Sequence, residues 1–320
     1  MQTITGKDIH AAAALLQKEE VVAIPTETVY GLAGNALSEI AVSKIYAAKN
    51  RPSFNPLILH VASINELEKY ANVDATSWLI ASTLMPGPIT LLLPKKTNVP
   101  DITTAGSNKV ALRVPNHAMA LSLLNECSFP LAAPSANPSG YISPTTAAHV
   151  FAGLEGRIPY ILDGGATTVG LESTICEVIN GAILLHRAGG ISAATLSALT
   201  GLEIKQNSNI TTPSTPGQLK SHYAPNIPLV IGKIEEEINK HVGKKIAVIS
   251  FQKNYGKQNG ITSFVLSVNG NLSEAANKLF ATLRLVDEAD YDLILTEIFP
   301  NEGIGPAIND RLHRAQFLHK

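Results

Sequence analysis

Short apolar runs of strand length alternate with helical patterns along most of the chain, and one polar segment interrupts this alternation. The interruption, residues 206–228, is poor in apolar residues and rich in Asn, Ser, Thr and Pro, which is typical of a linker. Alternating strands and helices fold by covering a sheet with helices. We therefore predict two α/β domains, residues 1–205 and 229–320, joined by a linker over residues 206–228.

The first domain is expected to be rich in strands. They cover residues 21–25, 57–61, 89–93, 110–114, 129–133, 158–162, 173–179 and 182–186. Ser38 is expected to cap a helix that ends before Pro52. Ser143 followed by Pro144 predicts a second N-cap, with a helix that runs through Phe151. Together these patterns predict a mixed α/β domain.

The second domain is smaller and alternates strictly. Its expected strands cover residues 229–231, 245–251, 263–268 and 291–297, and its expected helices cover residues 235–241, 273–287 and 307–318. Strict alternation of strand and helix predicts a small three-layer unit with a parallel sheet.

Composition narrows the class of protein. The chain has 320 residues, of which 45% are hydrophobic and 16% charged, and its formal net charge is -1. This gives no broad cationic face, so we expect weak or no direct nucleic-acid binding. No apolar run approaches the roughly 20 residues of a membrane span, and the N-terminus has no apolar signal core. Cys127 and Cys176 lack metal-ligand spacing. We predict a cytoplasmic protein with reduced thiols and no membrane contact.

Polar side chains gather where the expected strands of the first domain end. Lys49 and Arg51 lie just before a Pro- and Asn-containing turn, and Ser135 and Asn137 lie in a second polar loop. An Arg fork beside a Lys ammonium suits a phosphate or carboxylate group. Polar groups brought to one rim from several strand ends are the usual ligand site of an α/β domain. These two loops are therefore expected to face one pocket.

Each of these residues also has a simpler interpretation. Lys49 and Arg51 are equally typical of the cationic last turn of a helix, and Ser135 and Asn137 of a turn. His60, on an apolar strand, suits a hydrogen-bonded core position. The sequence contains no P-loop, no Gly-x-Gly-x-x-Gly after a strand, no Gly-x-Ser-x-Gly and no zinc-type cluster. Any nucleotide must then be held by side chains and short turns.

Six motifs, in their order and spacing, resemble the YrdC family. They cover residues 25–32, 49–52 with 55–57, 86–90, 112–115, 134–140 and 172–175. The Lys-x-Arg pair of Lys49 and Arg51 and the Ser-x-Asn pair of Ser135 and Asn137 match that family's signature. Residues 221–225 and 303–312 resemble the longer two-domain branch, the threonylcarbamoyl-AMP synthases.

This resemblance implies a YrdC-like catalytic domain with a mixed, twisted sheet and a small Rossmann-like C-terminal domain. It also implies a nucleotidyltransferase that condenses L-threonine, bicarbonate or CO2, and ATP to threonylcarbamoyl-AMP with release of pyrophosphate. A downstream transferase complex would use the product to make threonylcarbamoyladenosine in tRNA. Mg2+ is expected to be carried by the ATP phosphates, without ligands from protein side chains.

The resemblance also implies site residues. The catalytic group is Lys49, Arg51, Ser135 and Asn137. The ATP group is Arg51, Asn55, Lys109, Ser135, Ser143, Arg187 and Tyr223. The threonine group is Thr28, His60, Arg113, Ala133 and Ser173. Arg113 is the natural partner for the threonine carboxylate, and Tyr223 would belong to a lid formed by the linker.

Two other classes of function stay open on sequence alone. One is a nonenzymatic RNA-binding module, which the near-neutral charge disfavours. The other is a carbamoyl-adenylate-forming domain of a carbamoyltransferase, although the extra zinc-finger and acylphosphatase-like segments of those proteins are absent here.

Overall fold

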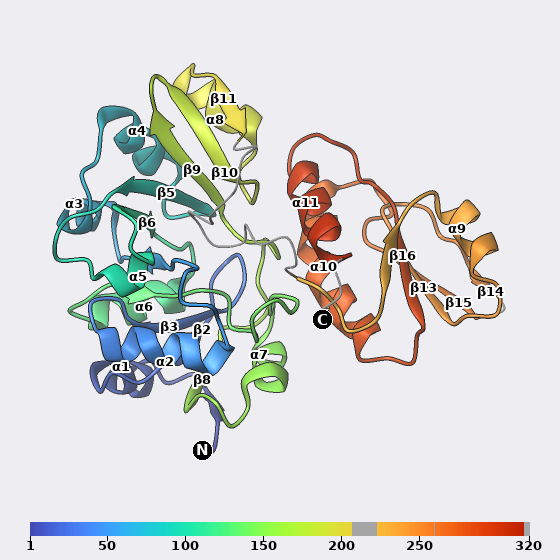
Figure 1. Cartoon of the computed structure of the whole chain (residues 1–320), viewed down its shortest axis with the longest axis horizontal. Helices are drawn as coiled ribbons and strands as arrows, with labels where there is room; N and C mark the ends of the chain where they lie inside the picture. The colour runs from blue at the N-terminus through green and yellow to red at the C-terminus, as the bar shows by residue number, and fades with distance from the viewer. Residues whose placement is uncertain (207–222, 259, 317–320) are drawn as a thin grey trace.

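Two sheets organise the chain, one in each domain (Figure 1). The computed structural model describes residues 1–206, 223–258 and 260–316. Within these residues the first sheet ends at Gln206 and the second begins at Leu229. Most of the predicted linker, residues 207–222, lies outside the described part of the chain.

The first sheet has the strand order β1-β8-β2-β3-β7-β4-β6-β5-β9-β10-β11. Its strands are β1 (Ile4–Gly6), β2 (Val22–Ile24), β3 (Gly31–Asn35), β4 (Ile58–His60), β5 (Ile89–Pro94), β6 (Lys109–Arg113), β7 (Leu131–Ala132), β8 (Tyr160–Leu162), β9 (Thr174–Ile179), β10 (Ala182–Arg187) and β11 (Ile204–Gln206). Parallel pairs such as β4·β6 and β5·β9 alternate with antiparallel pairs such as β5·β6 and β9·β10. The predicted mixed sheet is confirmed.

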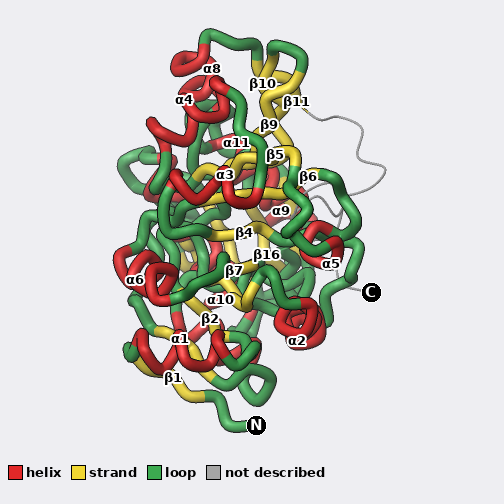
Figure 2. Tube along the Cα trace, turned by 90° about the vertical axis from the view of Figure 1, so that its left-hand side faces the viewer, coloured by secondary structure: helices red, strands yellow, loops and turns green. Residues whose placement is uncertain are grey.

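Helices cover both faces of this sheet. They are α1 (Ile9–Gln17), α2 (Glu39–Lys49), α3 (Leu67–Tyr70), α4 (Ala75–Leu84), α5 (Asp101–Thr104), α6 (Ala118–Glu126), α7 (Ala147–Leu154) and α8 (Ala193–Thr200), with a 3-10 turn at Ile64–Glu66. Alternate residues of β2 explain the two faces: Val22 packs with α1 and α6, whereas Ala23 packs in the larger core that includes α2. Figure 2 shows α2 and α5 together on one side of the strands and α6 on the other.

Helix α2 positions two of the predicted site residues. As expected, Ser38 is its N-cap, and the Ser38 side chain accepts a hydrogen bond from the amide of Ala41. The helix ends at Lys49 because Asn50 takes a left-handed conformation with φ of 51°. Arg51 therefore leaves the helix in a tight turn rather than continuing along its surface.

The predicted cap at Ser143 is wrong. Helix α7 begins after Thr146, whose side chain accepts from the amide of His149. The hydroxyl of Ser143 instead donates to the carboxylate of Glu172 at 2.6 Å, in the interior. A long-range contact thus outweighs the local capping pattern. The sequence also gave no prediction of β1, β3, α1, α4 or α6.

The second sheet has the order β12-β16-β13-β15-β14. The strands are β12 (Leu229–Ile231), β13 (Ile246–Ser250), β14 (Lys257–Gln258), β15 (Ile261–Val265) and β16 (Leu293–Thr296). All neighbours are parallel except the short edge strand β14, which was not predicted. Helices α10 (Leu272–Asp287) and α11 (Gly305–Ala315) lie toward the first domain, and α9 (Ile234–Lys240) lies on the far face (Figure 1). The predicted three-layer domain is confirmed.

The two domains share a buried contact. Val29, Ile142 and Leu171 of the first domain belong to the same apolar cluster as residues of α10 and α11. Arg284 of α10 is buried, donates to the carbonyl of Ile142, and lies 4.8 Å from the ring centre of Tyr141. In the part of the chain that the structure describes, no helix is both long and apolar enough to cross a bilayer.

Candidate active site

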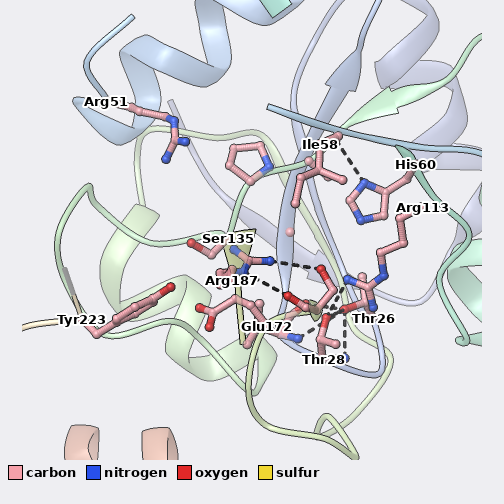
Figure 3. A pocket seen from close by; sticks show the side chains of 15 residues that line it. Thr26, Thr28, Arg51, Ile58, His60, Arg113, Ser135, Glu172, Arg187 and Tyr223 are labelled. Carbon is pink, nitrogen blue, oxygen red and sulfur yellow. Dashed lines mark hydrogen bonds between the residues drawn. The ribbon is translucent and has the colours of Figure 1, made fainter. Parts of the chain in front are cut away.

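A pocket in the first domain lies where several strands of the sheet end (Figure 3). Its lining residues are Thr26, Thr28, Val29, Gly31, Arg51, Ile58, His60, Arg113, Ala133, Pro134, Ser135, Glu172, Ser173, Arg187 and Tyr223. The register explains the convergence: parallel pairing of β4 with β6 places His60 beside Arg113, and antiparallel pairing of β9 with β10 brings Arg187 back beside the start of β9.

Nine of the residues predicted from the family resemblance line this one pocket. They are Thr28, His60, Arg113, Ala133 and Ser173 from the threonine group, and Arg51, Ser135, Arg187 and Tyr223 from the ATP group. Figure 3 shows Arg51 and Tyr223 on one side of the cavity and His60 with Arg113 on the opposite side. The structure therefore brings members of the two predicted groups together in one pocket, and their ligand contacts stay predictions.

Arg113 is held at its end by a buried ion pair. Its Nη2 lies 2.6 Å from Oε1 of Glu27, and both side chains are buried. Its Nη1 donates to the hydroxyl of Thr28 at 2.9 Å, and its Nε donates to the carbonyl of Gly87 at 3.3 Å. The Nη2 and both oxygens of Glu27 lack a well-aligned hydrogen bond in the described residues. The charge is balanced, but the hydrogen-bonding capacity of the pair is only partly used.

His60 is neutral in the folded protein. Burial and the neighbouring charge of Arg113 lower the pKa of His60 to about 3. Its Nδ1 lies 3.3 Å from the carbonyl oxygen of Ile58. A neutral imidazole at this position can orient a ligand through a hydrogen bond but adds no charge.

Arg187 and Ser173 form the middle of the pocket wall. Arg187 donates through Nε to the carbonyl of Ser173 and through Nη2 to its hydroxyl, both at 3.0 Å. The hydroxyl of Ser173 is also 2.7 Å from that of Thr90. Burial lowers the pKa of Arg187 to about 10, so its guanidinium stays charged at neutral pH.

Arg51 keeps an unbalanced charge. It donates through Nε to the carbonyl of Asn55 at 3.2 Å and through Nη2 to that of Pro56 at 3.0 Å. No carboxylate among the described residues forms an ion pair with it. Carbonyl oxygens fix the orientation of a guanidinium without neutralising it. Burial lowers the pKa of Arg51 to about 10, which still leaves it cationic at neutral pH.

Lys49 is not among the residues that line the pocket, and its predicted catalytic role beside Arg51 stays a prediction. Its ammonium is buried and donates to the carbonyls of Ser135 and Asn137. Burial, with a further contribution from Arg51, lowers the pKa of Lys49 well below the usual value. The geometry makes Lys49 the support of the Ser-x-Asn loop and so joins the two signature pairs in space.

Four further predicted residues lie outside the pocket lining. Asn55 and Asn137 are buried, and both polar side-chain atoms of Asn55 and the Oδ1 of Asn137 have no partner among the described residues. Unsatisfied buried amides are uncommon and suit a ligand that would complete them. Ser143 donates to Glu172 instead. Lys109, at the start of β6, forms an ion pair with Glu177, at the other end of the strand from Arg113.

Sequence reasoning assigned no role to Glu172, which lines the pocket, or to Arg311 of α11, which contacts it. The Nε of Arg311 lies 2.8 Å from Oε2 of Glu172. No local pattern marks this pair, because 139 residues separate its members. The motifs at residues 172–175 and 303–312 contain the two residues, but they indicated only the family and its longer branch.

The described residues contain no group of three or more His, Cys, Asp or Glu side chains that could hold a metal ion. The pocket carboxylate Glu172 already accepts from Ser143 and Arg311. The expectation that ATP phosphates carry the Mg2+ stays a prediction.

Both halves of the chain match known families. Residues 14–189 match the family model described as "Telomere recombination", and residues 191–316 match that of the threonylcarbamoyl-AMP synthase C-terminal domain. A threonylcarbamoyl-AMP synthase from Bacillus subtilis (strain 168) is 41% identical over 96% of this chain and 92% of its own length. One from Pyrococcus abyssi is 39% identical over 96% of this chain and 93% of its own. The chain belongs to the threonylcarbamoyl-AMP synthase family.

Solved structures agree with this membership. The structure described as P. abyssi Sua5 complexed with L-threonine matches with a TM-score of 0.91 at 37% identity, over 99% of this chain and 98% of that one. The E. coli YciO structure, at 21% identity and a TM-score of 0.52, shares the fold over 59% of the chain. The predicted YrdC-like domain and the two-domain branch of the synthase family are confirmed.

Proposed function

We propose that the pocket binds L-threonine and ATP at its two ends and, with bicarbonate or CO2, forms threonylcarbamoyl-AMP and pyrophosphate. The observation that carries this proposal is the convergence of nine predicted ligand residues in one pocket of a synthase-family protein. The relative from P. abyssi is described as bound to L-threonine, which supports the same ligand here.

The charges at the two ends suit the two substrates. At one end Arg113 and Glu27 balance each other, and His60 is neutral. A balanced site suits a zwitterion such as threonine, whose carboxylate would pair with Arg113. At the other end the hydrogen bonds of Arg51 within the described residues go to carbonyl oxygens, which suits the anionic phosphates of ATP.

The chemistry then needs mainly positioning. The threonine amine attacks CO2, a nitrogen–carbon bond forms, and the amine loses a proton to give a carbamate. A carbamate oxygen attacks the α-phosphorus of ATP, and the bond to the bridging oxygen breaks with departure of pyrophosphate. Arg51 and Arg187 would hold the phosphates and offset charge on the leaving group, while Arg113, Thr28 and Ser173 would hold the amino acid.

Other parts of the proposal follow from the reaction. Mg2+ would enter with ATP, held by phosphate oxygens, because the described carboxylates near the pocket are paired with arginines. A downstream transferase complex would consume the adenylate to modify tRNA, without tight binding of nucleic acid by this near-neutral chain. Use of ATP and supply of tRNA modification favour a cytoplasmic location.

Pyrophosphate release from ATP by the purified full-length protein tests the proposal. We expect release only when L-threonine and bicarbonate are both present, with threonylcarbamoyl-AMP detected by mass spectrometry. Turnover that needs carbamoyl phosphate instead of threonine would indicate a carbamoyltransferase-type activity. Absence of turnover under all conditions would refute the proposed synthesis.

A further inference from the structure

The carboxylate of Glu172 is held from both domains. Its Oε1 accepts from the hydroxyl of Ser143 at 2.6 Å, and its Oε2 accepts from the Nε of Arg311 at 2.8 Å. Glu172 lines the pocket and directly precedes Ser173, which contacts Arg187. A shift of Glu172 would therefore move part of the proposed ligand wall.

The ring of Tyr223 has two contacts with the C-terminal domain. Tyr223 lines the pocket, its ring stacks on Phe280 of α10 with centres 5.4 Å apart, and Arg311 lies 5.2 Å from its ring centre. It also takes a strained backbone conformation with φ of 64°. Such a conformation persists only where surrounding contacts fix it.

Arg311 is the residue common to both sets of contacts. It is fully buried, and its Nη1 lies 2.8 Å from Oδ2 of Asp310, the residue before it. A buried arginine that bridges two carboxylates and an aromatic ring is fixed in position by its own partners. The guanidinium therefore acts as a rigid link from α11 to the pocket wall.

We propose that Arg311 is a positioning residue for the reaction, through which the C-terminal domain fixes Glu172 and Tyr223 and so completes the active site of the first domain. This inference rests on the proposed function. It assigns Arg311 no contact with substrate, because Arg311 does not line the pocket. Misplacement of a ligand wall by about 1 Å can lower turnover by about 100-fold.

The charge state of Glu172 gives this role a distinctive signature. Burial would raise its pKa, but Arg311, Arg187 and the Ser143 hydroxyl together hold the pKa of Glu172 below its usual value. Further titratable groups near this network are Asp310, the ring of Tyr223, Arg314 and Arg113. Without Arg311, burial is opposed by fewer groups, so the pKa of Glu172 rises and the carboxylate becomes neutral as the pH falls.

The test compares Arg311→Gln, Arg311→Lys and a control, Arg314→Gln, in the full-length protein. Arg314 lies one turn later on α11, is 21% exposed, and pairs with the same Asp310. Rates of pyrophosphate release are measured from pH 6 to 9 as ratios to wild type, with the ATP affinity measured by calorimetry. Thermal unfolding followed by circular dichroism checks that each variant is folded.

We expect Arg311→Gln to lower kcat/KM for ATP at least tenfold, with a ratio to wild type that falls further as the pH decreases. Arg311→Lys should recover much of this pH profile, and Arg314→Gln should resemble wild type. In addition, the double variant Glu172→Gln, Arg311→Gln should be measured. Its fold-decrease in kcat/KM should be smaller than the product of the fold-decreases of the two single variants. Should Arg311→Gln fail to fold, Arg311→Lys carries the comparison: it should lower kcat/KM for ATP, because an ammonium does not reproduce the fork of a guanidinium, and an unchanged kcat/KM would contradict the inference.

A folded Arg311→Gln protein with the kcat/KM of wild type, or multiplicative losses in the double variant, would overturn the inference. A wild-type protein that releases no pyrophosphate would refute the proposed function instead. In that case the ATP affinities of the same proteins still decide the inference, because equal values for Arg311→Gln and wild type would contradict it.

Discussion

The neutral state of His60 makes a quantitative prediction about stability. The pKa of His60 is lowered to about 3 in the folded protein, whereas an unfolded histidine titrates near 6.5. Between these two values the unfolded chain binds a proton that the folded protein does not. The contribution of neutral His60 to the free energy of unfolding is therefore fully present above about pH 6.5. This contribution is lost progressively as the pH falls toward 3.

The size of the effect follows from this difference. At pH 5 the pH lies about 1.5 units below the pKa of His60 in the unfolded chain. Each unit of this difference lowers the free energy of unfolding by about 1.4 kcal/mol. His60 thus contributes a loss of about 2 kcal/mol between pH 7.5 and pH 5. His60→Gln, which replaces the ring with a neutral amide, should remove this part of the pH dependence whatever it does to stability at pH 7.5.

Denaturant unfolding at the two pH values checks the prediction. The single tryptophan, Trp78, lies in α4 and reports the first domain, so its fluorescence follows the domain that contains His60. His10→Gln is the matched control, because the side chain of His10 is 87% exposed. Between pH 7.5 and pH 5, the free energy of unfolding should fall by about 2 kcal/mol more in wild type and His10→Gln than in His60→Gln. Equal losses in all three proteins would show that folded His60 takes up a proton near its ordinary pKa, and would refute the reasoning.

Three further substitutions and one control test the pocket and its supports. Arg51→Ala should reduce pyrophosphate release by at least about 100-fold with little change in unfolding temperature, since it removes an unbalanced cation from the ATP end; near-normal turnover would exclude Arg51 from the site. Lys49→Met should lower activity, and it should lower the free energy of unfolding by about 1–3 kcal/mol, because the Asn137 carbonyl loses its ammonium partner. Lys44→Met, on the exposed side of the same helix, should change neither activity nor stability by comparable amounts. Gly189→Ala should lower the unfolding temperature and activity together, because its Cβ would lie 2.3 Å from the Glu172 carbonyl and 2.4 Å from the Ser173 backbone; a crystal structure with an unmoved 172–174 segment would contradict this.

Local signals in the sequence predicted some elements well. The cap at Ser38 and the turn after Lys49 correctly bounded α2, because both depend on residues within one helical turn. Strict alternation correctly predicted the parallel C-terminal sheet. The cap at Ser143 failed because its hydroxyl is used by Glu172, which is 29 residues away. Propensity describes a local preference, and a buried carboxylate in need of a donor outweighs it.

The pocket itself could be predicted only in part. Residues at strand ends could be identified as candidates, yet their grouping depends on the order β7-β4-β6-β5-β9-β10, in which sequence neighbours are often not spatial neighbours. The family resemblance supplied that grouping. It did not indicate that Lys49 supports a loop rather than lining the pocket, since this depends on which way one side chain turns after α2 ends.

Four buried cations in and around the site are of two kinds, according to whether their partners are carboxylates or carbonyl oxygens. This difference accounts for the layout of the site. Arg113 and Arg311 are paired with the carboxylates of Glu27 and Glu172, so each forms a locally neutral unit that fixes geometry. Lys49 and Arg51 are held by carbonyl oxygens and form no ion pair with a described carboxylate. A carboxylate beside Arg51 would neutralise the field that a polyphosphate needs, whereas carbonyls orient the cation and leave the field in place. Introducing a carboxylate near Arg51 should therefore weaken ATP binding more than threonine binding, and the reverse is expected for loss of Glu27.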